Sequence, residues 1–182
     1  NKNQDNFESE ISKSELSSFP KNVREFFSEK EVGRFIEMFE LRSNQLSMSE
    51  FIENNLKDKK ISLIEASPGT GKTMAYLAPI ALKAAEEGIK AVIATNTKAL
   101  QDQIVNKDWL LINKYLSTVN KKNEINLSIL KGRKNYICKK LVKNFIPSNF
   151  SELRVFFKIN KWSLSTLNGD ISEVDLKNEF PI

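Results

Sequence analysis

The chain has 182 residues, of which 40% are hydrophobic and 28% are charged, a balance typical of a globular protein. Its length suits one domain with room for an appendage. No apolar run approaches the ~20 residues of a transmembrane helix, and no signal peptide is visible, so we expect no membrane partner. The single cysteine excludes an internal disulfide and favours a reducing, cytoplasmic setting.

The net charge of +5 is concentrated in one part of the chain. Residues 98–144 carry eleven Lys or Arg against three acids, a local charge of +8. Such a block is expected of a surface that meets phosphate groups, although a Lys-rich stretch can equally be a solvated face.

The first third of the chain is predicted to be helical after a polar start. Residues 1–20 have the composition of a flexible lead-in that stops at Pro20. From about 22 to 56, apolar residues recur at helical spacing.

The spacing of apolar residues then changes to the alternating strand and helix pattern of an α/β protein. ISLIEA (61–66) predicts a short buried strand, residues 73–87 predict a helix ended by Gly88, and IKAVIAT (89–95) predicts a second strand. Together they form a β-α-β unit of the length expected for a parallel crossover.

The remaining elements are weaker in pattern. Helices are predicted from Lys98 to about Val105 and over 109–116, and INLSIL (125–130) is a third strand candidate. Asn149 with Glu152 three residues later predicts the start of another helix, as in a capping box.

Residues 66–73, ASPGTGKT, fit the Walker A pattern between a predicted strand and a predicted helix. Gly69 and Gly71 let backbone N–H groups face phosphate oxygens, and the helix that follows points its positive dipole end at the same anion. Lys72 can reach the β- and γ-phosphates, and the Thr73 hydroxyl can ligate Mg²⁺. We therefore expect ATP and Mg²⁺ to bind here, with Lys72 and Thr73 as catalytic residues. The predicted nucleotide-binding residues of this loop are Ala66, Ser67, Pro68, Gly69, Thr70, Gly71, Lys72 and Thr73.

Four segments occur in the order and at the spacing of one helicase group: FELRSNQ (39–45), EASPGTGKTMAYLAPI (65–80), ATNTKALQDQI (94–104) and LKGRKNYIC (130–138). With these segments the chain resembles DinG- and XPD-like superfamily 2 helicases, which translocate 5′ to 3′ on single-stranded DNA. The resemblance implies a P-loop NTPase (RecA-like) fold with a parallel sheet and flanking helices, incomplete in this chain.

The resemblance also implies a domain division. Residues 21–130 would be the N-terminal part of the ATP-binding lobe. Residues 131–182 would begin an inserted subdomain, either of the iron–sulfur type or helical, which we expect to be truncated.

Two further sets of site residues follow from the resemblance. Arg42 and Gln45 correspond to the adenine-side motif, and a Gln amide can pair with both the donor and the acceptor of the adenine edge. A surface helix start with a capping Gln is the alternative for this pair. The residues predicted to contact single-stranded DNA are Thr95, Thr97, Lys98, Gln101, Lys131, Arg133, Lys134, Asn135 and Tyr136.

These contacts would be made to the strand backbone and independent of base sequence, with Tyr136 as a stacking platform. Thr95 and Thr97 could instead, or in addition, be ordinary helix caps.

Parts of the motor are missing from this sequence. It has no His and no Asp-Glu dipeptide, so it lacks the acid that would orient the attacking water. The second RecA-like lobe, with its arginine finger, would have to be supplied in cis or in trans. We therefore expect this chain to be the N-terminal part of a longer helicase and to hydrolyse little ATP by itself.

Cys138 corresponds to the first of four thiolate ligands of a [4Fe–4S] cluster in the family. A cluster needs four such ligands, so it could exist only with three cysteines that this chain does not contain. The alternative for Cys138 is a buried filler residue.

Two functions therefore compete at this point. One is an ATP-dependent DNA helicase, and the other is a non-catalytic, nucleotide-gated nucleic-acid module in a larger assembly. An unrelated P-loop enzyme, such as a small-molecule kinase, leaves the other three segments and the basic block unexplained.

Overall fold

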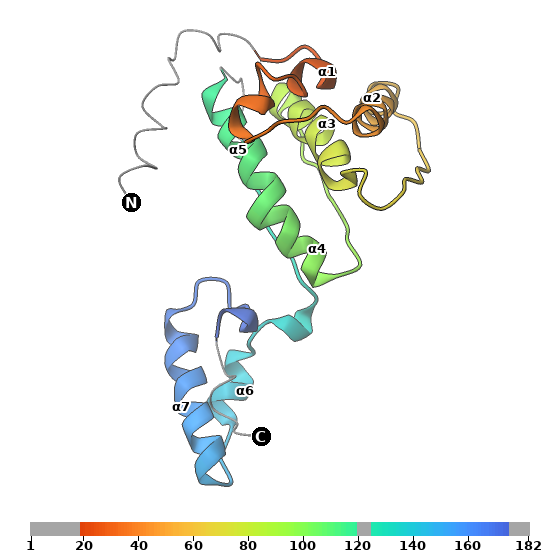
Figure 1. The fold of residues 1–182 in the computed structure, drawn as a ribbon. Helices are drawn as coiled ribbons and strands as arrows, with labels where there is room; N and C mark the ends of the chain where they lie inside the picture. The colour runs from red at the N-terminus through yellow and green to blue at the C-terminus, as the bar shows by residue number, and fades with distance from the viewer. Residues whose placement is uncertain (1–18, 120–124, 175–182) are drawn as a thin grey trace, which may run out of the picture. The chain divides into compact units, whose positions relative to one another are not determined.

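The computed structural model describes residues 19–119 and 125–174 and divides the chain into two compact units, Asn1–Leu127 and Ser128–Ile182. Most of the lead-in predicted for residues 1–20 lies outside the described residues. The elements of the first unit are α1 (Val23–Phe26), the 3-10 turn η1 (Val32–Phe35), α2 (Ser43–Lys57), α3 (Lys72–Glu87), α4 (Lys98–Gln103), the π-helical turn η2 (Ile104–Asp108) and α5 (Trp109–Thr118) (Figure 1).

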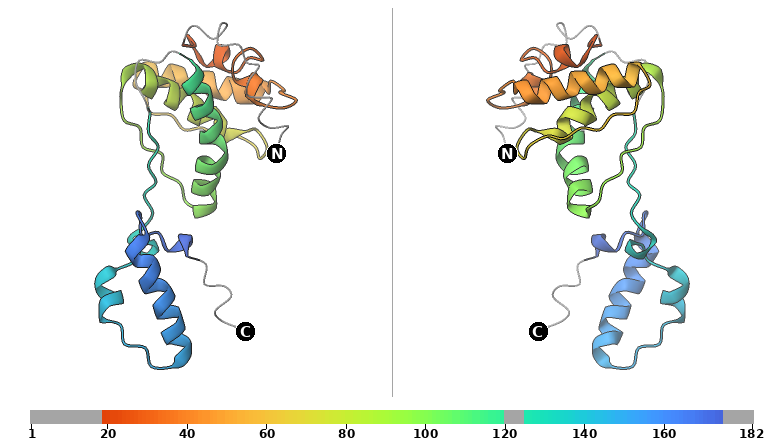
Figure 2. Two further views of the ribbon diagram at one scale, coloured as in Figure 1. Left: turned by 90° about the vertical axis from the view of Figure 1, so that its left-hand side faces the viewer. Right: turned by 90° about the vertical axis from the view of Figure 1, so that its right-hand side faces the viewer.

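The packing of α2 against α3 is the main helix contact of the first unit (Figure 2). Pro79 lies inside α3 and has no N–H group, so the carbonyl of Ala75 loses its helical donor. The Ser49 hydroxyl of α2, which is fully buried, donates to that carbonyl at 2.6 Å. One buried hydrogen bond between the helices therefore repairs the gap that proline leaves in α3.

The core of the first unit lies between α1, α3 and α5. Phe26 is fully buried and contacts Tyr115 edge-on, with ring centroids 4.9 Å apart. The Tyr115 hydroxyl donates to the Glu31 carboxylate at 3.0 Å, and burial with this negative neighbour raises the pKa of Tyr115 far above its usual value. The α4, η2 and α5 segments run on as one helical rod whose apolar side completes this core (Figure 2).

The predicted helices of this unit are confirmed with shifted limits. α3 begins one residue earlier than expected and ends at Gly88, which adopts a left-handed conformation with φ 68°. The helices predicted at 98–105 and 109–116 are present and joined by the π-helical turn. The stretch 22–56 is not one continuous helix. It contains two α-helices and a 3-10 turn, and the segment 36–42 before the second α-helix has no helix.

The predicted strands are not formed in the described part of the chain. Segments 61–66, 89–95 and 125–130 have no regular secondary structure, and Ile61, Leu63 and Val92 are exposed almost completely. A strand needs a neighbouring strand to pair its backbone groups, and these three segments do not pair with one another. The expected burial of 61–66 is therefore absent here, and the parallel sheet is not confirmed.

The second unit is a pair of helices closed by a polar contact. Its elements are the 3-10 turn η3 (Arg133–Asn135), α6 (Lys139–Asn144), α7 (Phe150–Ser165) and the 3-10 turn η4 (Ile171–Glu173). α6 and α7 pack side by side (Figure 2). Their side chains line an apolar cavity of about 260 Å³.

The predicted capping of α7 is confirmed. Asn149 accepts a hydrogen bond from the Glu152 N–H at 2.9 Å, and the Glu152 carboxylate accepts one from the Ser148 N–H at 2.8 Å. The carboxylate thus reaches one residue further back than in the usual capping box.

No helix in the described segments is long and apolar enough to cross a membrane.

The repair of α3 by Ser49 can be tested with a double-mutant cycle. We expect Ser49→Ala to lower the free energy of unfolding by about 1–3 kcal/mol, because the buried Ala75 carbonyl loses its donor. In a Pro79→Ala background the same change should cost clearly less, since the new backbone N–H can bond that carbonyl. Urea denaturation of the four proteins measures the coupling, and Ser47→Ala on the exposed side of α2 is the control. Equal costs in both backgrounds would contradict this account.

Candidate functional site

The loop before α3 has the backbone form that the glycines were expected to allow. Gly69 and Gly71 both have left-handed conformations, with φ 81° and 78°. Gly71 is the residue immediately before α3, and no side chain caps this helix end. The N-terminus of a 16-residue helix therefore opens onto the loop, with its positive dipole end available to an anion.

Lys72 folds back across this loop. Its ammonium group donates to the carbonyls of Ala66 at 2.6 Å and Ser67 at 3.1 Å. The Thr70 hydroxyl donates to the Ser67 carbonyl as well. The loop is thus closed on its own cation, and a phosphate that bound here would compete with two carbonyls for the Lys72 ammonium.

The start of α2 lies against the same loop. Arg42 donates from Nη1 to the Gly69 carbonyl at 3.2 Å, and Gln45 donates from Nε2 to the Gly71 carbonyl at 2.9 Å. A Cβ atom added at Gly71 would lie 2.2 Å from that Gln45 nitrogen, so only glycine leaves room for the contact. The structure therefore brings two predicted site residues onto the loop from 26 or 27 positions away in the sequence.

Two residues near Thr73 were missed by sequence reasoning. Burial raises the pKa of Tyr76, a hydrogen bond from Thr73 opposes this, and the Asp108 carboxylate raises it further. Asp108 is itself buried, which raises its pKa, and it accepts a hydrogen bond from Gln103 at 3.3 Å. The π-helical turn that carries Asp108 toward α3 leaves no clear mark in the sequence, which is why this acid was not found.

The segment 95–101 contains both a helix cap and exposed polar groups. Thr97 accepts a hydrogen bond from the Leu100 N–H at 3.3 Å, so it is the N-cap of α4, and the capping alternative is correct for it. The Thr95 hydroxyl donates to the Thr97 carbonyl at 3.3 Å. Lys98 is exposed at the first position of α4, and Gln101 is half-buried one turn later.

The basic segment 131–136 divides into structural and exposed residues. The Lys131 ammonium contacts the Asp170 carboxylate at 2.6 Å, and these side chains are only 7% and 15% exposed. The hydrogen bond from Lys131 lowers the pKa of Asp170 to about 2, although burial opposes this shift. The Tyr136 hydroxyl accepts from the Lys131 N–H at 2.8 Å, and Asn135 is buried and donates to the Gly132 carbonyl.

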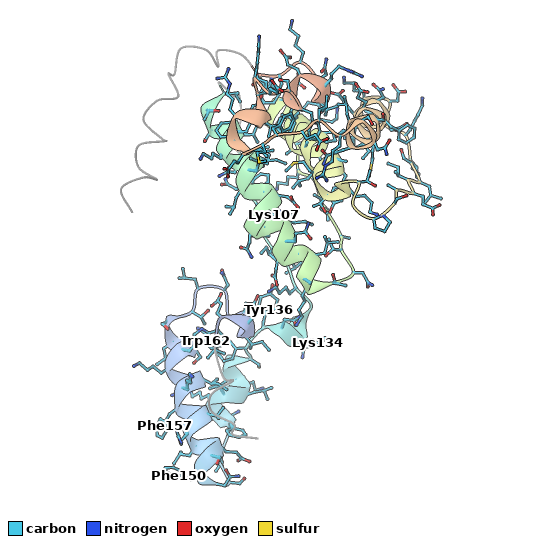
Figure 3. All side chains as sticks on the ribbon, viewed as in Figure 1. Lys107, Lys134, Tyr136, Phe150, Phe157 and Trp162 are labelled. Atoms are coloured by element: carbon cyan, nitrogen blue, oxygen red, sulfur yellow. The ribbon has the colours of Figure 1, made fainter. Side chains whose placement is uncertain are left out.

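Arg133 and Lys134 are the two members of this segment that point into solvent (Figure 3 labels Lys134). The Ile137 N–H donates to the Gly169 carbonyl at 2.8 Å, so the segment is also tied to the chain that follows α7. Lys131, Asn135 and Tyr136 therefore hold the second unit together, and the cationic surface of 131–136 consists of Arg133 and Lys134.

The donor sets for the two predicted metal groups differ. Thr73 offers one hydroxyl oxygen at the loop, which suits Mg²⁺, an ion that takes most of its ligands from water and phosphate. Cys138 is exposed at the start of α6, and the described residues contain no group of three or more metal-ligating side chains. With one cysteine in the chain, the residues present do not fit a [4Fe–4S] cluster.

Comparison with known proteins finds a helicase family model and two groups of relatives. The family model of the DEAD/DEAH box helicase matches residues 46–150. ATP-dependent DNA helicase YoaA of Haemophilus influenzae is 37% identical over 157 residues, which are 84% of this chain and 23% of that protein. The same-named helicase of Escherichia coli is 32% identical over 152 residues, or 81% of this chain and 22% of that protein.

A second group of relatives is named for another activity. The 3′-5′ exonuclease DinG of Staphylococcus saprophyticus is 34% identical over 139 residues, covering 75% of this chain and 15% of that protein. The chain thus spans less than a quarter of the length of these relatives. No solved structure gives a significant match.

The contact between Gln45 and Gly71 can be isolated with glycine substitutions. Gly71→Ala and Gly69→Ala both place a side chain at a left-handed φ, at a similar cost of about 1–2 kcal/mol. Only Gly71→Ala should also displace the Gln45 amide, since a Cβ at Gly69 would meet no atom within 4 Å. Gln45→Ala should therefore lower the free energy of unfolding of the parent and of Gly69→Ala, but not of Gly71→Ala. A cost of Gln45→Ala that is equal in all three backgrounds would refute the contact.

Proposed function

The chain belongs to the DEAD/DEAH box helicase family, and we propose that it is the ATP-binding N-terminal part of a DinG-type DNA helicase that translocates on single-stranded DNA. The observation that carries this proposal is the convergence of Lys72, Arg42 and Gln45 on one phosphate loop. Three donors with different roles toward ATP meet there from two helices.

We infer the following roles for the loop. The phosphates of ATP would lie against the N-terminus of α3, where Lys72 leaves the Ala66 and Ser67 carbonyls to bind the β- and γ-phosphate oxygens. Arg42 and Gln45 hold the Gly69 and Gly71 carbonyls, which fixes the backbone of the loop. The amide oxygen of Gln45 would then accept a hydrogen bond from the adenine amino group. The other predicted loop residues, Ala66, Ser67, Pro68, Thr70 and Thr73, complete the nucleotide contact.

Mg²⁺ bound with the nucleotide would neutralise phosphate charge and would take the Thr73 hydroxyl as its protein ligand. Tyr76 hydrogen-bonds Thr73 and so positions that hydroxyl. The sequence contains no Asp-Glu dipeptide, so hydrolysis would need a further carboxylate and an arginine finger. We propose that these come from the rest of the motor, including a second RecA-like lobe, and that this chain by itself binds ATP without turning it over.

The proposed fold of the first unit is a RecA-like lobe over residues 21–130. In it the segments 61–66, 89–95 and 125–130 would pair as parallel strands flanked by the helices described above. The exposed apolar side chains of the first two segments support this, since they are the ones that a sheet would bury. Residues 131–182 would begin an inserted subdomain of the helical type. A cytoplasmic location remains a prediction from the single cysteine.

The contacts that we propose with single-stranded DNA are electrostatic and independent of base sequence. Thr95, Thr97, Lys98 and Gln101 present hydroxyl, ammonium and amide groups around the start of α4, and Arg133 and Lys134 add two exposed cations. Backbone contacts of this kind bind phosphate without reading bases.

A non-catalytic, nucleotide-gated binding module is the second candidate. Such a module would bind nucleotide at the same loop and would need no acid to activate water. It predicts ATP-dependent DNA affinity with no ATPase activity even when the chain is joined to the rest of its motor. The helicase predicts DNA-stimulated hydrolysis under that condition.

Nucleotide binding is tested by replacing the loop lysine. Lys72→Ala should weaken binding of a fluorescent ATP analogue with Mg²⁺ by at least about tenfold, because the phosphates lose a charge-assisted bond of roughly 1.5–3 kcal/mol. Lys83→Ala, on the same helix and paired with Glu87, is the matched control and should bind normally. Unchanged affinity in a folded Lys72→Ala variant would disprove the phosphate role.

Binding of single-stranded DNA is tested by replacing the exposed cations and leaving the structural Lys131 in place. Arg133→Ala with Lys134→Ala should weaken binding of a single-stranded oligonucleotide and reduce the slope of log affinity against log salt by about 1.4, or 0.7 for each phosphate contact. The pair Lys30→Ala and Lys90→Ala removes the same charge from exposed positions elsewhere and should leave the slope unchanged. A flat salt response of the parent chain would rule out strand binding by this route.

A further inference from the structure

A stripe of five exposed side chains runs along α7. Residues three or four positions apart lie on one face of a helix. The stripe follows that spacing and consists of Phe150, Arg154, Phe157, Lys161 and Leu164. All five are exposed, with Phe150 at 75%, Phe157 at 62% and Leu164 at 82%.

The stripe is distinct from the packing face of the same helix. Val155, Phe156 and Ile159 face α6 and line the cavity between the two helices. Phe156 lies 6.0 Å from Phe145, measured between ring centroids. Phe150 and Phe157 lie along the side of α7 away from α6 (Figure 3). Phe157 meets this packing face at its edge, with its ring centroid 6.0 Å from that of Phe156. Both stripe rings nevertheless remain largely exposed to solvent.

The order of side chains along the stripe indicates the chemistry of its partner. Aromatic or apolar groups alternate with cations, and no acid interrupts them. The two rings are seven residues apart, about 10 Å along the helix axis. The described part of the second unit, residues 128–174, carries nine Lys or Arg against three acids, a net charge of +6. A partner must therefore offer flat apolar faces and negative charge in alternation over about 20 Å.

We propose that this face of α7 binds single-stranded nucleic acid, with bases stacked on Phe150 and Phe157 and backbone phosphates paired with Arg154 and Lys161. A single strand carries both required groups on every nucleotide, and its bases are free to stack on aromatic rings. The proposal rests on the proposed function and extends it, because it adds a stacking surface to contacts that were otherwise electrostatic. It adds two rings to the single stacking platform predicted at Tyr136, whose hydroxyl is bonded within the second unit.

Stacking and charge contribute differently to affinity, so each can be removed separately. With an oligothymidylate of about 15 nucleotides, a length within the range of single-strand sites, fluorescence anisotropy of the full chain gives affinity against salt. Phe150→Ala with Phe157→Ala should bind about 10- to 100-fold more weakly with an unchanged salt slope. Arg154→Ala with Lys161→Ala should lower the slope by about 1.4.

Two controls make the result specific to stacking on this face. Phe51→Ala removes an aromatic ring that is 50% exposed in the first unit, and it should not change affinity. Phe150→Leu with Phe157→Leu keeps the apolar surface but removes the rings, and it should lose affinity much as the Ala pair does. Because the substitutions are at exposed positions, circular dichroism should show an intact fold.

The outcomes separate this inference from the proposed function. If the parent chain binds the oligonucleotide in a salt-dependent way and the Phe variants bind equally well, the stripe is not a strand surface, whereas the helicase proposal stands. If the Leu pair binds like the parent and the Ala pair does not, the face contacts the oligonucleotide through apolar area without ring stacking, and the stacking inference is wrong. If the parent chain does not bind at all, both this inference and the strand contacts of the proposed function fail.

Discussion

The buried hydrogen bond from Ser49 to the Ala75 carbonyl fixes the geometry on which the nucleotide loop depends. Pro79 creates the need for it by removing the donor that the helix would otherwise supply. Because Ser49 lies in α2, the repair sets the distance and register between α2 and α3. Arg42 and Gln45 lie at the start of the same α2, and in this register both side chains reach the loop.

The loop itself is closed in this state by its own groups. The carbonyls of Ala66, Ser67, Gly69 and Gly71 each accept a hydrogen bond from a side chain of α2 or α3. Lys72 alone would have to change partners when a phosphate binds, whereas Arg42 and Gln45 can keep theirs. The arrangement therefore provides a frame that stays in place and one cation that moves.

The basic block has a divided role that composition could not reveal. Lys131 looks in the sequence like Arg133 and Lys134, yet its ammonium group is largely buried against Asp170, 39 positions away. That ion pair closes the second unit and leaves the neighbouring cations in solvent. Conversely, Phe150 and Phe157 are large apolar residues of an amphipathic helix, and the structure leaves them 75% and 62% exposed. Composition gives the number of charged and apolar side chains, whereas the helix face that packs against the rest of the unit decides which of them are buried.

The sequence by itself determined the local features: the Walker A loop with its two glycines, the ends of α3, the cap of α7 and the family to which four ordered segments point. The loop, the helix ends and the cap depend on residues within a few positions of one another, and short-range steric and hydrogen-bonding rules are sufficient to predict them. The family follows from the order and spacing of the four segments. The strands could not be settled in the same way, because a strand exists only when another segment pairs with it, and 61–66 finds no partner in the described residues. Only the tertiary structure decided that Gln45 bonds the Gly71 carbonyl, that Asp108 approaches Tyr76 and that Lys131 is structural. Each of these is a contact between distant positions, and its energy depends on a packing that no local pattern encodes.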